Sequence, residues 1–160
     1  DHVARLLRAF RSGFAAAVGL AELPELLGPG ELARLLRGER EVDAEDWERQ
    51  ARYAEGCSGA VAEVRQFWAV VRGLPQEDLQ ALCQLVTGLP TPPAGGFGAL
   101  VPPFVLTCRR DYFEKSICVY TYQNVVELPV CSGGVGQMRQ KVASLLSTAG
   151  KAAAGSPRSF

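Results

Sequence analysis

Apolar residues recur at helical spacing along most of the first half of the chain and again near its end. In the opening run, Val3, Leu6, Leu7 and Phe10 share one face and the arginines lie off it. Local signals mark where other helices begin and end. Asp43 is a favourable N-cap residue, and Thr87-Gly88 ends the helix that contains Cys83. The pattern predicts helices over Val3–Phe14, Glu31–Arg37, Ala44–Gln50, Val61–Val71, Pro75–Val86 and Val135–Leu146.

The period of the pattern changes after a proline- and glycine-rich stretch, Leu89 to Gly98, which interrupts regular structure. The short runs "FVLTC", "SICVY" and "NVVEL" that follow are rich in β-branched and aromatic residues, which favours strands. The segment from Ala149 to Phe160 is small and polar, and we expect it to fray. Helices, then short strands, then a helix indicate an α+β fold. We predict that its core contains Phe67, Trp68, Leu82, Val86 and Phe97.

The composition limits the classes of partner. Seventeen basic residues balance seventeen acidic ones in a chain of 160 residues that is 48% hydrophobic. Such a chain is long enough for one domain with a real core, or for one small domain plus a piece of another. A balanced charge removes the electrostatic case for nucleic acid or an anionic membrane as a main partner. No apolar run approaches the roughly 18 residues of a membrane span.

The cysteines do not form a metal-binding pattern. There are five of them, no pair is spaced C-x-x-C, and the chain has one histidine, His2. We therefore expect neither a metal site nor a cofactor. An odd and scattered set indicates reduced thiols, and so a cytoplasmic or nuclear protein. The cysteines are Cys57, Cys83, Cys108, Cys118 and Cys131.

Three blocks in fixed order carry a family resemblance. "DWERQARYAEG" precedes "VRQFWAVV", which precedes "ALCQLVTGLPTPPAGGFGAL". In this order and spacing they resemble the C-terminal part of HECT-type ubiquitin ligases. Upstream, Gly13-Phe14 and "PGELARLLRGE" look like the end of the family's larger N-terminal lobe (N-lobe). The resemblance extends over residues 1–147.

The resemblance implies a domain arrangement. Residues 1–40 would end the N-lobe, residues 41–147 would form the smaller C-terminal lobe (C-lobe), with helices packed on a small β-sheet, and residues 148–160 a flexible tail. A hinge between the lobes is expected near Glu39 to Ala44, where the chain is highly charged. A helical pattern starts at once from Asp1, so we expect a fragment or the C-terminal end of a longer polypeptide. Apolar surface around Leu20, Leu23 and Leu26 would then be exposed.

The family's catalytic residue is a cysteine that accepts ubiquitin as a thioester and passes it to a substrate lysine. It lies in a Leu-Pro-x-x-x-Thr-Cys run, with Asn two residues on and Leu-Pro at six and seven residues on. Here Thr121 matches the Thr, Asn124 the Asn, and Leu128-Pro129 the closing pair. The nucleophile's position holds Tyr122. Tyr120 precedes the Thr, where the family often has His, and Ser116-Ile117 replaces the leading Leu-Pro.

That departure leaves the chemistry open. A phenol with an ordinary pKa near 10 is ionised to about 0.1% at pH 7, against a few per cent for a thiol. Cys118 lies four residues upstream, up to ~13 Å away in extended chain, and would need a rearranged loop. Cys131 follows the Leu-Pro pair, and we predict that it belongs to the core.

Three interpretations of the function therefore remain open, and the first two both assume membership of the family. One is an active ubiquitin transferase that uses Cys118. The other is a HECT-like lobe without a thioester nucleophile, which retains the fold and contacts to ubiquitin or a substrate protein. An unrelated α+β binding module would explain the pattern without the family. By the resemblance, a conjugating enzyme (E2) would engage only through N-lobe sequence that this chain does not contain.

Overall fold

The computed structural model describes residues 2–18, 28–54, 56–109 and 116–154, without the side chains of residues 17–18 and 149–154. The chain divides into two compact units, Asp1–Arg37 and Gly38–Phe160. This division falls between Arg37 and Gly38, three residues before the boundary expected from the sequence. Each unit is described separately below.

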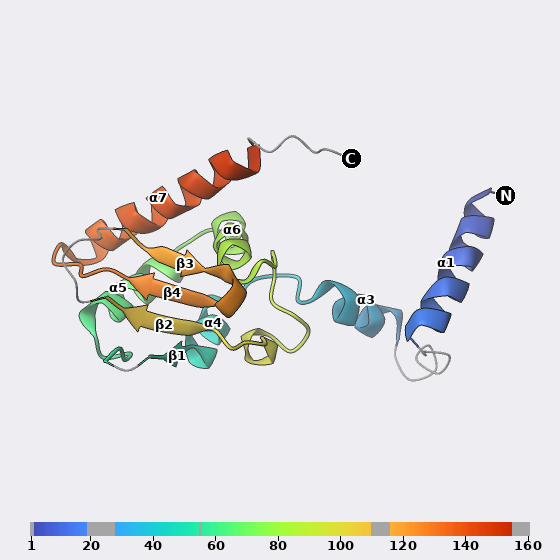
Figure 1. Ribbon diagram of the computed structural model, residues 1–160, viewed down its shortest axis with the longest axis horizontal. Helices are drawn as coiled ribbons and strands as arrows, with labels where there is room; N and C mark the ends of the chain where they lie inside the picture. The colour runs from blue at the N-terminus through green and yellow to red at the C-terminus, as the bar shows by residue number, and fades with distance from the viewer. Residues whose placement is uncertain (1, 19–27, 55, 110–115, 155–160) are drawn as a thin grey trace. The chain divides into compact units, whose positions relative to one another are not determined.

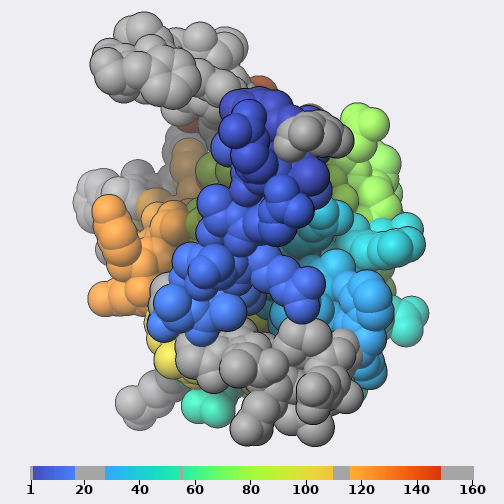
Figure 2. Space-filling view, turned by 90° about the vertical axis from the view of Figure 1, so that its right-hand side faces the viewer, coloured from blue at the N-terminus to red at the C-terminus, as the bar shows by residue number. Residues whose placement is uncertain are grey.

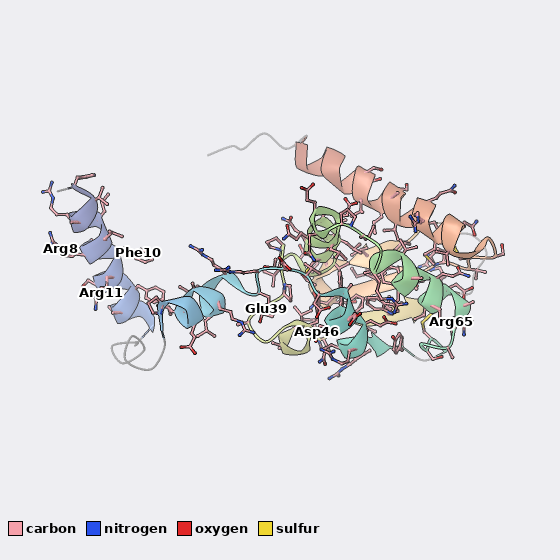
Figure 3. All side chains as sticks on the ribbon, turned by 180° about the vertical axis from the view of Figure 1, so that it is seen from behind. Arg8, Phe10, Arg11, Glu39, Asp46 and Arg65 are labelled. Atoms are coloured by element: carbon pink, nitrogen blue, oxygen red, sulfur yellow. A yellow bond between two sulfur atoms is a disulfide. The ribbon has the colours of Figure 1, made fainter. Side chains whose placement is uncertain are left out.

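The described part of the first unit consists of helices α1, His2–Val18, and α3, Pro29–Arg37. Both were predicted, and α3 ends where Gly38 adopts a left-handed φ of 82°. Phe10 lies on the opposite side of α1 from Arg8 and Arg11 (Figure 3). The described residues of this unit are drawn in shades of blue in Figure 2. Its exposed large apolar side chains include Val3, Leu6, Leu7, Phe10, Leu35 and Leu36. The expected apolar surface at Leu20, Leu23 and Leu26 lies outside the described residues.

The second unit is an α+β domain, as predicted. Its helices are α4, Ala44–Gln50, α5, Ala62–Val71, α6, Gln76–Thr87, and α7, Gly134–Ala154. Its strands are β1, Arg52–Tyr53, β2, Val105–Cys108, β3, Cys118–Tyr120, and β4, Val125–Leu128. A 3-10 turn, η1, covers Phe97–Ala99, and a second, η2, covers Thr121–Gln123.

The strands form one sheet in the order β1-β2-β4-β3 (Figure 1). β1, β2 and β4 are parallel, and β3 runs antiparallel to β4. Helices α4, α5 and α6 lie behind the sheet in Figure 1, and α7 packs against α5. Leu106, Val126 and Leu128 are buried, and the residues between them are half-buried, as the strand period of two requires. The sheet therefore has one face covered by helices and one that is partly open.

The core is built around aromatic rings. Trp47 stacks on Phe97 with ring centroids 4.5 Å apart, and meets Trp68 and Phe104 edge-on. Such pairs add to the burial of their large apolar area. The core predicted from the sequence is confirmed, because each of its five members is at most 2% exposed: Phe67, Trp68, Leu82, Val86 and Phe97.

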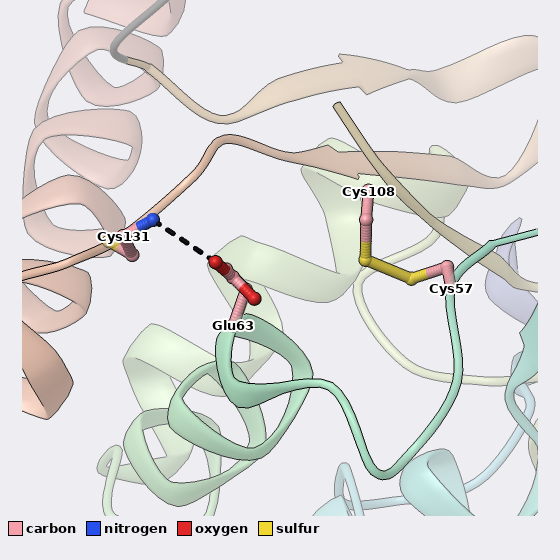
Figure 4. The surroundings of a disulfide bond; sticks show 4 residues. All are labelled: Cys57, Glu63, Cys108 and Cys131. Carbon is pink, nitrogen blue, oxygen red and sulfur yellow. Dashed lines mark hydrogen bonds between the residues drawn. A yellow bond between two sulfur atoms is a disulfide. The ribbon is translucent and has the colours of Figure 1, made fainter. Parts of the chain in front are cut away.

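We expected every cysteine to be a reduced thiol, and two of the five are not. Cys57 and Cys108 form a disulfide with their Cα atoms 5.4 Å apart (Figure 4). The expectation was wrong for this pair because 51 positions separate the two residues in sequence. Parallel pairing of Tyr53 with Leu106 brings the turn after β1 beside the end of β2. Spacing along the chain does not reveal such a contact.

The last helix also differs from its prediction. α7 continues to Ala154, into the segment that we expected to fray from Ala149. Alanines are frequent there, and alanine has the highest intrinsic helix propensity. Residues 155–160 lie outside the described part. Among the described residues, no helix has both the length and the apolar composition that crossing a bilayer requires.

Replacement of Trp47 by alanine should remove the centre of the aromatic core. We expect Trp47→Ala to lower the free energy of unfolding by roughly 3–5 kcal/mol, measured by urea denaturation. Tyr122→Ala is the matched control, because Tyr122 is 99% exposed, and it should change stability by less than about 0.5 kcal/mol. Equal effects of the two changes would contradict the central position of Trp47.

The disulfide should contribute measurably to stability. Closure of a loop of this length restricts the unfolded chain by up to about 4 kcal/mol. We expect Cys57→Ser, or reductant added to the native chain, to lower the urea midpoint. Reductant should then have no further effect on Cys57→Ser. If the native chain and Cys57→Ser have the same urea midpoint, with and without reductant, the disulfide does not contribute to stability.

Candidate functional site

The residues singled out by the sequence motif lie in and around the turn that joins β3 to β4. Thr121, Tyr122 and Gln123 form η2, and Asn124 closes it in the left-handed conformation, with φ 53° and ψ 41°. Asparagine tolerates this conformation better than most residues. The Asn124 N–H donates to the Thr121 carbonyl at 3.3 Å. The turn is thus a short closed loop with its own hydrogen bond.

Asn124 fastens the turn to the segment before β2. It is 5% exposed, and its Nδ2 donates to the Pro102 carbonyl at 2.5 Å. Its own carbonyl accepts from the Val105 N–H at 2.9 Å. A buried amide with partners for both its side chain and its main chain fixes the loop in one position.

Thr121 fastens the turn to helix α6. Its Oγ1 donates to the Leu85 carbonyl at 2.7 Å. Leu85 lies in the last turn of α6, where carbonyls have no partner within the helix. The Leu89 N–H, which would have reached Leu85 in a longer helix, donates instead to Thr87 Oγ1 at 3.1 Å. The Thr121 hydroxyl therefore satisfies a carbonyl that the helix end leaves open.

Tyr122 lies between these two anchors and projects into solvent, with 99% of its side chain exposed. Leu128 and Pro129, at the far end of the motif, are both buried. The Leu128 carbonyl accepts from the Arg109 N–H at 2.8 Å. The turn is thus held at both ends and presents a phenol at the position where the resemblance in sequence predicts a thiol.

Cys118 lies at the start of β3 rather than in the turn. It is half-buried, and it pairs with Glu127 of β4 in the antiparallel ladder. Two further pairs, Val119 with Val126 and Tyr120 with Val125, separate it from η2. Moving Cys118 to the tip of the turn requires that this ladder be opened and shifted.

A polar cluster that sequence reasoning missed flanks Cys118. The Tyr120 hydroxyl donates to Glu127 Oε2 at 3.2 Å, and Arg109 Nη2 is 2.8 Å from the same oxygen. The hydrogen bond to Glu127, and then that carboxylate's charge, raise the pKa of the Tyr120 phenol. The sequence offered no signal for this cluster, because the β3–β4 register alone brings Tyr120 and Glu127 to one face.

The two other reduced cysteines are poor nucleophiles. Cys131 is 4% exposed, which confirms its prediction as a core residue. Its N–H lies 3.5 Å from Glu63 Oε1 (Figure 4), and burial raises the pKa of its thiol. Burial also raises the pKa of the Cys83 thiol to about 11, although a hydrogen bond with Thr87 opposes the shift. Neither thiol is suited to react at neutral pH.

The geometry suits recognition better than acid–base chemistry. The chain's one histidine, His2, belongs to the first unit, so the turn has no imidazole from its own unit to act as a base. In the part of the chain that the structure describes, no group of three or more His, Cys, Asp or Glu side chains gathers to hold a metal. What the turn offers is a rigid loop with an exposed aromatic ring.

Comparisons with known proteins match most of the chain. A family model described as HECT-domain (ubiquitin-transferase) matches residues 1–138. The chain is similar to the E3 ubiquitin-protein ligase TOM1-like of Neurospora crassa, at 33% identity over 130 residues, 77% of this chain and 3% of that protein. It is also similar to the E3 ubiquitin-protein ligase HACE1 of Danio rerio, at 37% over 95 residues, and of Homo sapiens, at 34% over 95 residues. Each HACE1 match covers 59% of this chain and 10% of the relative. The chain thus spans a tenth or less of the length of these relatives.

Thiol labelling should separate the reduced cysteines by exposure. We expect an uncharged maleimide at pH 7 to modify Cys118 first in the native chain, while Cys83 and Cys131 react only after unfolding. Mass spectrometry of peptides identifies the labelled residue, and Cys118→Ser is the control. Early labelling of Cys131 would contradict its burial.

Proposed function

The chain belongs to the HECT-domain family of ubiquitin transferases, and we propose that it is the C-terminal part of a HECT-type E3 ligase whose nucleophile position is occupied by Tyr122. In this proposal the second unit acts as a HECT-like lobe that binds ubiquitin or a substrate protein without forming a thioester at the β3–β4 turn. An E2 engages the whole protein through N-lobe sequence outside this chain. The observation that carries the proposal is the fully exposed phenol of Tyr122 in an otherwise well-anchored motif loop.

The loop retains the parts of the motif that hold its shape. Thr121 and Asn124 make the two hydrogen bonds that anchor it, and Leu128 is fully buried behind it. The reacting atom differs from the family pattern, a phenol oxygen in place of sulfur, and Ser116-Ile117 stands where the pattern has its leading Leu-Pro. Phenols as a class form far less of the reactive anion at neutral pH than thiols do. Retention of the loop without its nucleophile favours binding over group transfer.

The second candidate is an active transferase that uses Cys118. It is supported by the partial exposure of this thiol, which lies outside the disulfide. In that reaction the Cys118 sulfur attacks the thioester carbon of the charged E2, the carbon–sulfur bond to the E2 breaks, and the E2 thiol leaves with a proton. A substrate lysine amine then displaces Cys118. The β3–β4 ladder opposes this candidate, because Cys118 must leave its pairing with Glu127 to reach the turn.

The proposed compartment remains the cytoplasm or nucleus. The argument from reduced thiols no longer supports it, because Cys57 and Cys108 are paired. The compartment therefore rests on the family alone.

Charging by an E2 tests the proposal in the full-length protein. We expect no reductant-sensitive ubiquitin adduct in the native protein, and we expect Tyr122→Cys to gain one, because the anchored loop would then present a thiol. Gln123→Cys is the matched control, since Gln123 is the exposed neighbour in the same turn, and it should gain little or no adduct. The adduct is measured on a non-reducing gel and confirmed by mass spectrometry.

The alternatives give distinct results in the same assay. An adduct on the native protein that is lost in Cys118→Ala and kept in Cys131→Ala would establish the second candidate. Failure of Tyr122→Cys to form any adduct would show that the turn does not occupy the nucleophile's place. Ubiquitin binding that weakens in Tyr122→Ala, measured by titration, would support the binding role directly.

A further inference from the structure

The turn that follows β1, described at residues 56–60, buries one side chain. Cys57 is 6% exposed, and the other four residues of the turn are exposed. The Cys57 N–H donates to the Ala54 carbonyl at 2.9 Å, a contact within the same stretch of chain. The Cys57 sulfur is bonded to Cys108, the last residue of β2 (Figure 4). The disulfide therefore fastens this turn to the sheet.

Strand β1 itself is weakly held at the edge of the sheet. It has two residues, of which Arg52 is exposed and Tyr53 half-buried. The Arg52 N–H donates to the Phe104 carbonyl at 2.9 Å. The Ala54 N–H donates to the Leu106 carbonyl at the same distance. Hydrogen bonds of this kind contribute about 1 kcal/mol each, and an edge with little buried area opens at a low cost in free energy. The disulfide therefore supplies much of what keeps β1 paired.

The remainder of the domain has attachments of its own. Arg109, which follows Cys108, donates its N–H to the Leu128 carbonyl at 2.8 Å, and its Nη2 lies 2.8 Å from Glu127 Oε2. β2 pairs with β4 over four positions, and the aromatic rings around Trp47 pack on one another. A domain with such a core folds without a disulfide, unlike small scaffolds that depend on one. Reduction should therefore leave the domain folded and change its β1 edge.

The two bonded sulfurs differ in exposure, because Cys108 is half-buried and Cys57 is buried. Thiol–disulfide exchange begins at the sulfur that the attacking thiolate reaches, which here is Cys108 Sγ. A bond forms from the reductant to Cys108, the bond between the cysteines breaks, and Cys57 leaves as a thiolate that takes up a proton. A second reductant thiol then displaces Cys108 as a thiol, and the reductant ends as a disulfide. Glutathione disulfide drives the reverse reaction and is itself reduced to two thiols.

We propose that Cys57 and Cys108 form a reversible redox site, which exchanges with glutathione or a protein dithiol and closes or opens the β1 edge of the sheet. In a cytoplasmic or nuclear protein, a disulfide beside three reduced cysteines is typical of a redox-sensing pair rather than a structural bond. This last argument rests on the proposed compartment, whereas the placement of the pair does not. The redox site is independent of whether the β3–β4 turn binds ubiquitin.

A redox titration of the native chain tests the proposal directly. The chain is equilibrated in mixtures of reduced and oxidised glutathione, quenched with acid and alkylated, and the two cysteines are followed by mass spectrometry of peptides. We expect the pair to pass from mostly oxidised to mostly reduced across the series, and to return when the mixture is reversed. Cys118→Ser is the matched control, since it removes the other half-exposed cysteine, and it should titrate as the native chain does. A bond that persists in the most reducing mixture would overturn the proposal.

Brief exposure to glutathione alone identifies the sulfur that is attacked. We expect roughly tenfold more mixed disulfide with glutathione at Cys108 than at Cys57, because access decides the site of attack. In Cys57→Ser, Cys108 should form the same mixed disulfide and keep it, since its partner thiol is absent. Mixed disulfide found chiefly at Cys57 would overturn the assignment.

Amide hydrogen exchange in the two redox states measures the structural effect. On reduction we expect the Ala54 and Cys57 N–H groups to lose protection, while the N–H groups of Arg109 and Trp47 keep theirs through their bonds to Leu128 and Asp43. Cys57→Ser should show the reduced pattern in every mixture. Unchanged protection at Ala54 would show that the bond does not hold the edge. Protection lost at Trp47 as well would show that it holds the whole domain. Either result would overturn the proposal, and neither bears on ubiquitin binding by the β3–β4 turn.

Discussion

The position of the candidate site depends on the burial of Trp47. Its ring stacks on Phe97 and contacts Trp68 and Phe104 edge-on, so it joins α4 to η1, to α5 and to the segment just before β2. Phe104 is followed by Val105, whose N–H is bonded to the Asn124 carbonyl. One aromatic contact therefore fixes the start of β2, and through Asn124 it fixes the turn. The conformation of the turn is determined by its own residues, and its position in the domain is determined by the aromatic core.

The sequence predicted the elements of this fold well, because the hydrophobic period is strong in each of them. Trp68 and Phe97 were identified as core from their spacing and surroundings, and both are buried. β1 was missed since it has two residues and no period of its own. The disulfide was missed because it depends on the pairing of β1 with β2, which brings together residues that no local pattern connects.

The candidate site was predictable in part. The motif spacing pointed to Thr121, Tyr122 and Asn124, which the structure brings into one turn. Spacing did not indicate which groups would hold them, because the Leu85 and Pro102 carbonyls are main-chain atoms that carry no sequence signature. Nor did it show that Cys118 faces Glu127, since a register is a property of two strands together. Charge along the chain also did not indicate that the Glu39 carboxylate would accept a hydrogen bond from the Gly95 amide.

The order of strands in the sheet has a consequence for the kinetics of folding. β3 and β4 are joined by one short turn, so the hairpin that carries Tyr122 closes a small loop at low entropic cost. The parallel pairing of β1 with β2 joins Arg52 to Val105, with two helices between them in sequence. Contacts at such separation form slowly, because a long loop must close before they contribute. We therefore expect the β3–β4 hairpin to form early in folding and the pairing of β1 with β2 to form late. The turn then adopts its conformation before the rest of the domain has folded.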